Sequence, residues 1–278
     1  MRGTIHLIAA EDYPWIRDLV APPQIRGSQR RMAQEGLSPG KAERARPIVR
    51  KMLAGGPVKR VEIREQLARK GIKPKGRQAI VHLLNWMTYE GEIVTGPYVD
   101  GKETMVPLTD WLHRRPRAPE DPAAELARRY LIGYGPATLE DFRWWSSLPA
   151  ARARAGWAAI GDELVDEGDG LWRHRSQRRA GGGPAPVRFL PMWDHYFLGY
   201  RDRSHVGPPS VMEGVSAGGM FNPLVIADGK ASGVWKLTRQ GSDSALRLEP
   251  LGRLPSRQAI REEVADVGRF LSAKVTLA

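Results

Sequence analysis

The chain has 278 residues, a formal net charge of +12 and no cysteine. At roughly 150 residues per domain, this length predicts two or three modules, and 41% hydrophobic residues with nine tryptophans exclude wholesale disorder. The lack of cysteine excludes disulfides, thiolate metal sites and a cysteine nucleophile, and it fits a reducing compartment. The basic excess indicates a polyanionic partner, either nucleic acid or an anionic membrane surface, although an arginine-rich composition is also typical of a GC-rich genome.

Apolar spacing predicts three helices and a hairpin between residues 41 and 115. The three helical stripes are Ile48, Val49, Met52 and Leu53, then Ile63 and Leu67, then Ile80, Leu83, Leu84 and Met87. After Gly91, the runs Ile93-Val94 and Met105-Val106 flank Asp100-Gly101, which is a hairpin signal. Three helices followed by a hairpin is the order of a winged helix.

The same order returns over residues 121–178, at an offset of 79 residues that relates Gly56-Pro57 to Gly135-Pro136 and Gly91 to Gly170. Such self-similarity indicates a repeated supersecondary unit. Thr138 stands at a helix N-cap with Asp141 three residues on, which is close to a capping box. The third helix of this unit carries Ala153, Trp157, Ile160 and Leu164. A chance helical hairpin is the alternative interpretation.

Residues 186–278 follow a Gly-rich and Pro-rich break and have a different pattern. Short strands are predicted at Val187–Leu190, within Pro223–Lys236 around Asp228-Gly229, and at Leu246–Glu249. A closing helix carries Ile260, Val264, Val267 and Leu271 on one face. We therefore expect an α+β protein in which tandem winged-helix modules precede a small antiparallel-sheet domain with a C-terminal helix.

Candidate DNA-binding residues follow from the winged-helix prediction, because the third helix of that fold enters the major groove. In the first predicted module its polar face carries Gln78, His82 and Asn85, with Lys75 and Arg77 at the N-terminal end. The second predicted module offers only Arg152 and Arg154, so we expect it to dock rather than read bases. The alternative for each is a solvated polar face.

Residues 191–205 form the densest polar constellation, with four aromatic residues, two carboxylates, two arginines and two histidines. Asp194 and Asp202 are the candidate catalytic carboxylates, and Tyr200, Arg201 and Arg203 are candidate DNA contacts. A salt-bridged structural hinge at residues 201–203 is an equally good interpretation. His195 and His205 match no common metal-site spacing, so we expect no metal.

Several separated motifs together resemble the AlkZ/YcaQ-type winged-helix DNA glycosylases. They are Arg2–Leu7, Gly135–Thr138 with Phe142–Trp145, Leu198–Arg203, Phe221–Pro223, Asp228-Gly229 and Gly233–Trp235. The resemblance spans nearly the whole chain, although Trp193 stands where these proteins more often have Phe. It implies tandem winged helices around double-stranded DNA, excision of alkylated bases or unhooking of interstrand crosslinks by a monofunctional glycosylase, and no cofactor.

The family's catalytic element is a Gln-apolar-Gln or Gln-apolar-Asp motif in an N-terminal winged helix, and none of the eight glutamines belongs to such a motif. Residues 1–40 accordingly resemble the wing of that module followed by a helical linker. Either the true start lies upstream of Met1, or the protein is a shortened DNA-binding relative, and the sequence leaves both open. The enzymatic assignment is therefore uncertain.

The functional expectation is a DNA-repair protein resembling base-excision glycosylases, and the alternative is a non-enzymatic DNA-binding or regulatory module. A third interpretation, a scaffold whose basic surface meets protein or membrane, lacks a basic amphipathic helix or lipidation signal. The early polar residues exclude a signal peptide, and no run approaches about 18 apolar residues. We expect a cytoplasmic monomer with no membrane partner.

Overall fold

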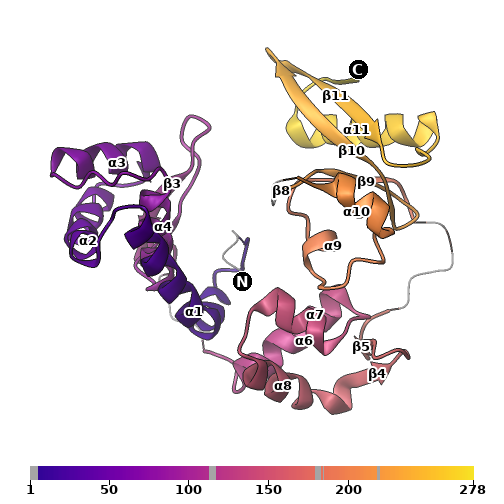
Figure 1. The fold of residues 1–278 in the computed structure, drawn as a ribbon, viewed down its shortest axis with the longest axis horizontal. Helices are drawn as coiled ribbons and strands as arrows, with labels where there is room; N and C mark the ends of the chain where they lie inside the picture. The colour runs from indigo at the N-terminus through magenta and orange to yellow at the C-terminus, as the bar shows by residue number, and fades with distance from the viewer. Residues whose placement is uncertain (1–5, 113–116, 179–182, 184, 218–219) are drawn as a thin grey trace. The chain divides into compact units, whose positions relative to one another are not determined.

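The computed structural model describes residues 6–112, 117–178, 183, 185–217 and 220–278, and its elements are mixed helices and strands (Figure 1). The chain divides into two compact units, Met1–Arg129 with Ser146–Asp162, and Tyr130–Trp145 with Glu163–Ala278. These units do not coincide with the four predicted segments, whose boundaries stay predictions. Residues 1–5, which hold most of the predicted wing strand, lie outside the described residues. The α+β class is confirmed.

The first unit contains helix α1 (Tyr13–Gln34) and the first predicted set of three helices and a hairpin. The set comprises α2 (Pro39–Leu53), β1 (Val58–Lys59), α3 (Arg60–Arg69), α4 (Ala79–Tyr89), β2 (Ile93–Thr95), β3 (Thr104–Pro107) and the short α5 (Leu108–Trp111). Its core consists of the predicted apolar stripes, with Val49, Ile63, Leu67, Leu83 and Met87 all fully buried. The periodicity therefore identified the buried faces correctly.

The predicted hairpin is confirmed in its register. Val94 pairs with Val106 in an antiparallel sheet whose strand order is β1-β3-β2. Asp100 and Gly101 both have positive φ, at 52° and 67°, which is the geometry of the two-residue turn that favours Asp-Gly. The sequence signal and the turn geometry agree because few residues tolerate two successive left-handed conformations.

The second predicted set has the same chain order. It comprises α6 (Pro122–Tyr134), α7 (Leu139–Ser146), α8 (Ala150–Ala158), the 3₁₀ turn η1 (Gly161–Glu163), β4 (Leu164–Asp166) and β5 (Trp172–His174). An isolated bridge joins Ala137 to Trp172, and Ala137 stands 79 residues after Val58, which pairs with the first hairpin. One prediction is wrong: α8 ends before Leu164, which lies in β4 instead, because Gly161 and Asp162 interrupt the helical run.

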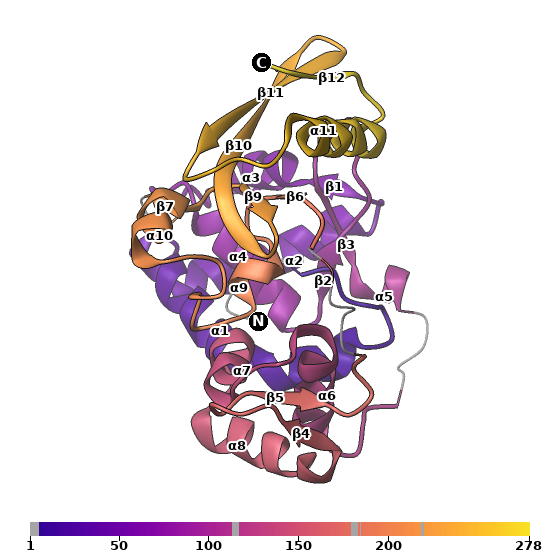
Figure 2. The same ribbon diagram turned by 90° about the vertical axis from the view of Figure 1, so that its right-hand side faces the viewer.

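The C-terminal part of the second unit is built on a five-stranded sheet of order β12-β11-β10-β9-β6. Its strands are β6 (Arg188–Leu190), β9 (Leu224–Ala227), β10 (Lys230–Gln240), β11 (Asp243–Pro250) and β12 (Val275–Leu277). The predicted closing helix is α11 (Arg257–Leu271), which lies beside the sheet in both views (Figures 1 and 2). The sheet departs from the expected antiparallel pattern because β12 pairs parallel to β11 after the chain returns along α11.

Alternation along β9 divides the packing between the two faces of this sheet. Val225 packs with Phe189, Ile260 and Val264 beneath α11. Leu224 and Ile226 point to the other face, where they join a second core around α9 (His195–Leu198) and α10 (Pro209–Val215). The short pair β7 (Ser216–Ala217) and β8 (Met220–Phe221) follows α10. This second core positions the residue 191–205 constellation.

Within the described residues, no helix is both long and apolar enough to cross a bilayer.

Candidate nucleic-acid interface

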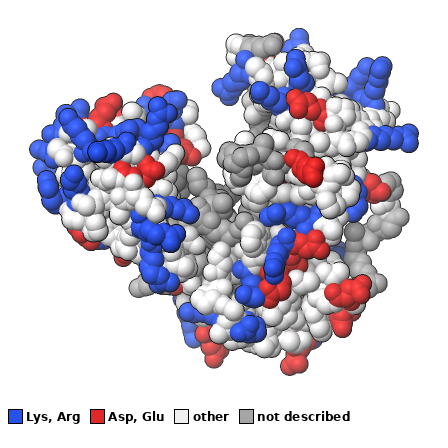
Figure 3. All heavy atoms as spheres, viewed as in Figure 1, with Lys and Arg blue, Asp and Glu red and all other residues white. Residues whose placement is uncertain are grey.

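A cationic surface covers α2, α3 and the loop that precedes α4. Between residues 41 and 77, eleven exposed Lys and Arg residues stand against three exposed glutamates, and Figure 3 shows blue side chains gathered over this part of the first unit. The exposed cations are Lys41, Arg44, Arg50, Lys51, Arg60, Arg64, Arg69, Lys70, Lys73, Lys75 and Arg77. Such a concentration produces a positive potential suited to phosphate contacts.

Two of the predicted DNA-binding residues, Lys75 and Arg77, belong to this cationic surface and are exposed, as is Gln78. Most of the other exposed cations were not among the predicted DNA-binding residues, because the prediction rested on the third helix of a winged helix and not on the local balance of charges. Residues 41–77 contain thirteen Lys and Arg against three Glu, so a count over this window alone identifies most of the excess charge of the chain.

The expectation that α4 presents a free polar face is wrong. Helix α1 packs along α4, and no residue of α4 is exposed, with His82 and Asn85 half-buried. Burial, together with the nearby charge of Arg31 in α1, lowers the pKa of His82. The error arises from tertiary packing. The apolar periodicity shows which face of α4 packs into the core of the first unit, but it does not show that α1 covers part of the opposite face.

The N-terminus of α4, near the predicted DNA contacts Lys75 and Arg77, is occupied by a carboxylate of the chain. Gly76 N–H donates to the backbone carbonyl of Glu35 at 2.9 Å, and Gln78 N–H donates to Glu35 Oε2 at 3.3 Å. A glutamate at this end of a helix is favoured by the same dipole that would favour an anionic ligand. The backbone amides at this helix end are therefore engaged by Glu35 rather than free to hold an anionic ligand.

Arg152 and Arg154 are exposed on α8. They lie in the first unit, whereas Tyr200, Arg201 and Arg203 lie in the second.

Asp141 holds the loop at residues 199–203 against the start of α7. Its Oδ2 accepts from Thr138 N–H at 3.0 Å and from Thr138 Oγ1 at 2.7 Å, while its Oδ1 accepts from Arg201 N–H at 2.8 Å and Asp202 N–H at 3.3 Å. The predicted cap is thus confirmed: Asp141 N–H also donates to Thr138 Oγ1. The buried carboxylate joins two sequence motifs about 60 residues apart.

Residues 201–203 have a partly structural role, because they make contacts within the second unit. Arg201 is exposed and pairs with Glu140 at 3.2 Å, whereas Asp202 accepts from Ser204 N–H at 2.9 Å, a hydrogen bond that lowers the pKa of the carboxyl. Arg203 is half-buried, and its guanidinium lies over the rings of Phe197, Phe221 and Trp144. Of the two predicted arginines, Arg201 is therefore the better placed to contact a ligand.

Tyr134, Asp194 and His195 form a half-buried polar cluster. The Tyr134 hydroxyl lies 2.5 Å from His195 Nδ1, and their rings stack. Asp194 caps α9 by accepting from Tyr196 N–H at 2.7 Å. Burial lowers the pKa of His195, although the charge of Asp194 opposes this, and burial with the same charge raises the pKa of Tyr134. A neutral imidazole and a protonated phenol beside a carboxylate can position a water molecule.

The predicted contact Tyr200 is half-buried near this cluster. Its hydroxyl donates to the backbone carbonyl of Tyr134 at 2.6 Å, and burial raises its pKa to about 12. The second candidate carboxylate, Asp202, is exposed and is not in the cluster. No group of three or more metal-binding side chains occurs among the residues that were placed.

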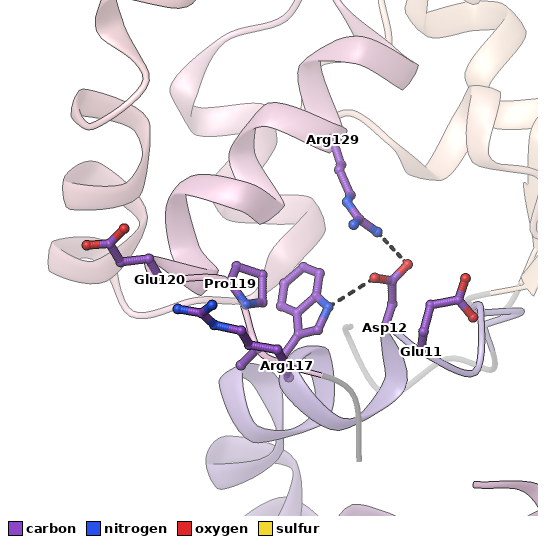
Figure 4. A pocket seen from close by; sticks show the side chains of 8 residues that line it. Glu11, Asp12, Arg117, Pro119, Glu120 and Arg129 are labelled. Atoms are coloured by element: carbon purple, nitrogen blue, oxygen red, sulfur yellow. Dashed lines mark hydrogen bonds and ion pairs between the residues drawn. The ribbon is translucent and has the colours of Figure 1, made fainter. Parts of the chain in front are cut away.

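A separate pocket of about 410 Å³ lies in the first unit, lined by residues that include Asp12, Trp15, Arg117 and Arg129 (Figure 4). Trp15 Nε1 donates to Asp12 at 3.1 Å, and Arg129 pairs with the other Asp12 oxygen. Burial alone would raise the pKa of Asp12, but the hydrogen bonds from Arg129 and Trp15 lower it. These contacts make the pocket wall a structural ion pair that stays charged near neutral pH.

Comparison with known proteins identifies the class. The solved structure of Streptomyces sahachiroi DNA glycosylase AlkZ matches with a TM-score of 0.72 at 24% identity, covering 100% of this chain and 80% of that one. The interstrand DNA cross-link repair glycosylase of Streptomyces sahachiroi is 28% identical over 299 residues, which cover 97% of this chain and 77% of the relative. The fold is thus shared with a DNA glycosylase. Residues 1–270 match the family described as DNA glycosylase AlkZ-like, and the chain belongs to this family.

Proposed function

We propose that this protein binds double-stranded DNA as a monomer through the cationic surface of residues 41–77 and removes damaged bases from it as a DNA glycosylase. The observation that carries the proposal is the concentration of exposed cations on α2 and α3 in a member of the AlkZ-like family. Phosphate contacts by Lys and Arg supply most of the affinity of such interfaces.

The element order supports winged-helix modules at residues 41–115 and 121–178, followed by the α+β domain at 186–278. In the first module, α1 packs along α4, and Glu35 lies at the N-terminus of α4. The phosphate contacts of this module therefore come from α2, α3 and the loop before α4, and groove reading by His82 or Asn85 is not part of the proposal.

The chemistry that a monofunctional glycosylase needs is a positioned water and a negative charge beside an oxocarbenium-like sugar, as in glycoside hydrolysis generally. Among the described residues, Asp194 with His195 and Tyr134 offers this combination, because the carboxylate lies beside two neutral hydrogen-bonding groups. In the proposal, Asp194 stabilises the developing positive charge while the imidazole orients the water. Asp202, with its exposed position and Ser204 hydrogen bond, holds the loop.

The second candidate function is a non-enzymatic DNA-binding or regulatory module. It requires only the exposed cations of residues 41–77 and no reacting group.

One assay distinguishes a DNA glycosylase from a non-enzymatic DNA-binding module. A duplex containing N7-methylguanine is incubated with the protein, and abasic sites are measured by alkaline strand cleavage. A glycosylase yields cleaved strands. Asp194→Asn lowers the rate about a hundredfold, as expected when a preorganised charge that stabilises the transition state is removed, while the exposed-residue control Asp243→Asn keeps the wild-type rate. Salt-sensitive binding without cleavage supports the non-enzymatic module. An absence of binding at any salt concentration contradicts both functions.

A further inference from the structure

A connected aromatic cluster lies in the second unit outside the polar cluster described above. The Arg203 guanidinium carbon is 4.5 Å from the ring centroid of Phe197, 5.4 Å from that of Phe221 and 5.8 Å from that of Trp144. Trp193 continues the cluster, since its ring meets Phe221 at 5.3 Å and 87°. The cluster therefore has a tryptophan at each end, and the Arg203 guanidinium lies over three of its four rings.

Both end tryptophans are open to solvent. Trp144 is 39% exposed and Trp193 37% exposed, and Met192 beside it is 42% exposed. Phe197 and Phe221, by contrast, belong to the core of this unit. We call the exposed surface of Trp144 and Trp193, with the Arg203 guanidinium over the Trp144 ring, the tryptophan platform.

The backbone at Trp193 is strained in a way that favours a role for its side chain. Its φ is +67°, in a turn that Asp194 N–H closes onto the carbonyl of Pro191. A glycine would suit this position, whereas a residue with a bulky side chain is disfavoured there. Such strain persists where the surroundings hold it, and it concentrates at ligand-binding sites.

We propose that the tryptophan platform binds an unpaired nucleobase of a distorted duplex by stacking. Wide aromatic faces backed by arginine are the groups on which proteins stack single bases, and a glycosylase must contend with bases that leave the helical stack. Arg201 is exposed two residues before Arg203 in the same loop, and it offers a cation to a phosphate that flanks such a base. This inference rests on the proposed DNA-binding function.

The choice of a base over a protein partner follows from charge and area. The chain carries a net charge of +12, which favours encounter with a polyanion. The platform consists of two partly exposed rings and one nearby cation, whereas a stable protein interface needs about 800 Å² from each partner. A single flat base, which needs only a ring face and a nearby cation, fits this surface.

The test compares two DNA duplexes that differ by one unpaired nucleotide, here 2-aminopurine in a single-nucleotide bulge. Fluorescence anisotropy of an end label measures the affinity for each duplex. The protein should bind the bulged duplex about tenfold more tightly, which is 1.4 kcal/mol and within the range of one stacked base. Trp144→Leu with Trp193→Leu should abolish this preference while the affinity for the fully paired duplex is unchanged.

The matched control is Trp111→Leu, because Trp111 is 52% exposed in the first unit and outside the platform. The 2-aminopurine emission gives an independent readout: it should be lower in the wild-type complex than in the double-variant complex, since stacking on indole quenches it. The single variants Trp144→Leu and Trp193→Leu serve if the double variant fails to fold, and each should reduce the preference.

Three results overturn the inference. The first is a wild-type protein that binds both duplexes equally, which leaves DNA binding itself intact. The second is a preference that survives both substitutions or is lost equally in Trp111→Leu. The third is an absence of any DNA binding, which ends the proposed function together with this inference.

Discussion

The buried carboxylate of Asp141 connects the start of α7 to the loop at residues 199–203. Four of the hydrogen bonds it accepts come from Thr138 and from the backbone of residues 201 and 202, and the residue is only 5% exposed. Buried polar groups lose more when their partner is removed than the bond itself contributes, because the remaining donors are left desolvated. The loop that carries Arg201 therefore depends on this side chain.

Replacing Asp141 by Ala should destabilise the protein by about 3 kcal/mol, as expected for a lost cap together with unsatisfied buried donors. Urea unfolding followed by circular dichroism measures the change. Asp121→Ala is the matched control, since Asp121 caps α6 by accepting from Ala123 and Ala124 N–H groups but is exposed, and it should cost about 1 kcal/mol. Equal effects of the two substitutions would contradict the role given to Asp141.

The half-buried His195 predicts a pH dependence of stability. Burial lowers its pKa in the folded protein, with the charge of Asp194 opposing, so the fold favours the neutral imidazole. Its contribution is complete above the unfolded-state pKa of about 6.5 and is lost as the pH falls through the lower folded-state pKa. Between pH 7.5 and 5.5, the wild-type protein should thus lose more free energy of unfolding than His195→Gln, measured by urea titration at both pH values. An equal loss in both proteins would refute this linkage.

At the scale of elements, helices α2 and α3 and the loop before α4 present the cations, and α4 is an internal helix of its unit. This division follows from α1, which packs along α4. The cations of α2 and α3 project from faces opposite the buried Val49, Ile63 and Leu67. Amphipathic helices with a cationic outer face suit contacts with the phosphate backbone, which require no fixed side-chain geometry.

Charge reversal on these two helices should weaken DNA binding and reduce its salt dependence. In the variant Lys51→Glu with Arg64→Glu, the slope of log affinity against log salt concentration should decrease by about two, one for each lost phosphate contact. Anisotropy titrations between about 50 and 200 mM salt measure this slope. The control Arg253→Glu with Arg261→Glu changes two exposed arginines of the other unit and should leave the slope near wild type. A slope altered equally by both pairs would show general charge effects alone.

At the scale of the whole molecule, the sequence predicted much of the fold because its signals are local. Val94 pairs with Val106 around Asp100-Gly101 as expected, and Ile260 and Val264 of the closing helix pack under the sheet. The parallel pairing of β12 could not be foreseen, since a three-residue strand at the chain end carries no signal for direction. The sequence predicted Asp194 and Asp202 as the candidate carboxylates, but it did not predict which side chains surround them. Asp194 lies with His195 and Tyr134, whereas Asp202 is exposed and lies outside this cluster.

The amino-acid sequence by itself determined the helices, the hairpin turn, the cationic character and the family to which the protein belongs, because periodicity, turn residues and charge are properties of neighbouring positions. Only the tertiary structure decided which surfaces are available. It placed α1 over α4, set Glu35 at the N-terminus of that helix, and enclosed Arg203 among aromatic rings. Each of these results depends on contacts between residues far apart in the chain, and no local pattern specifies which of two polar faces another helix will cover.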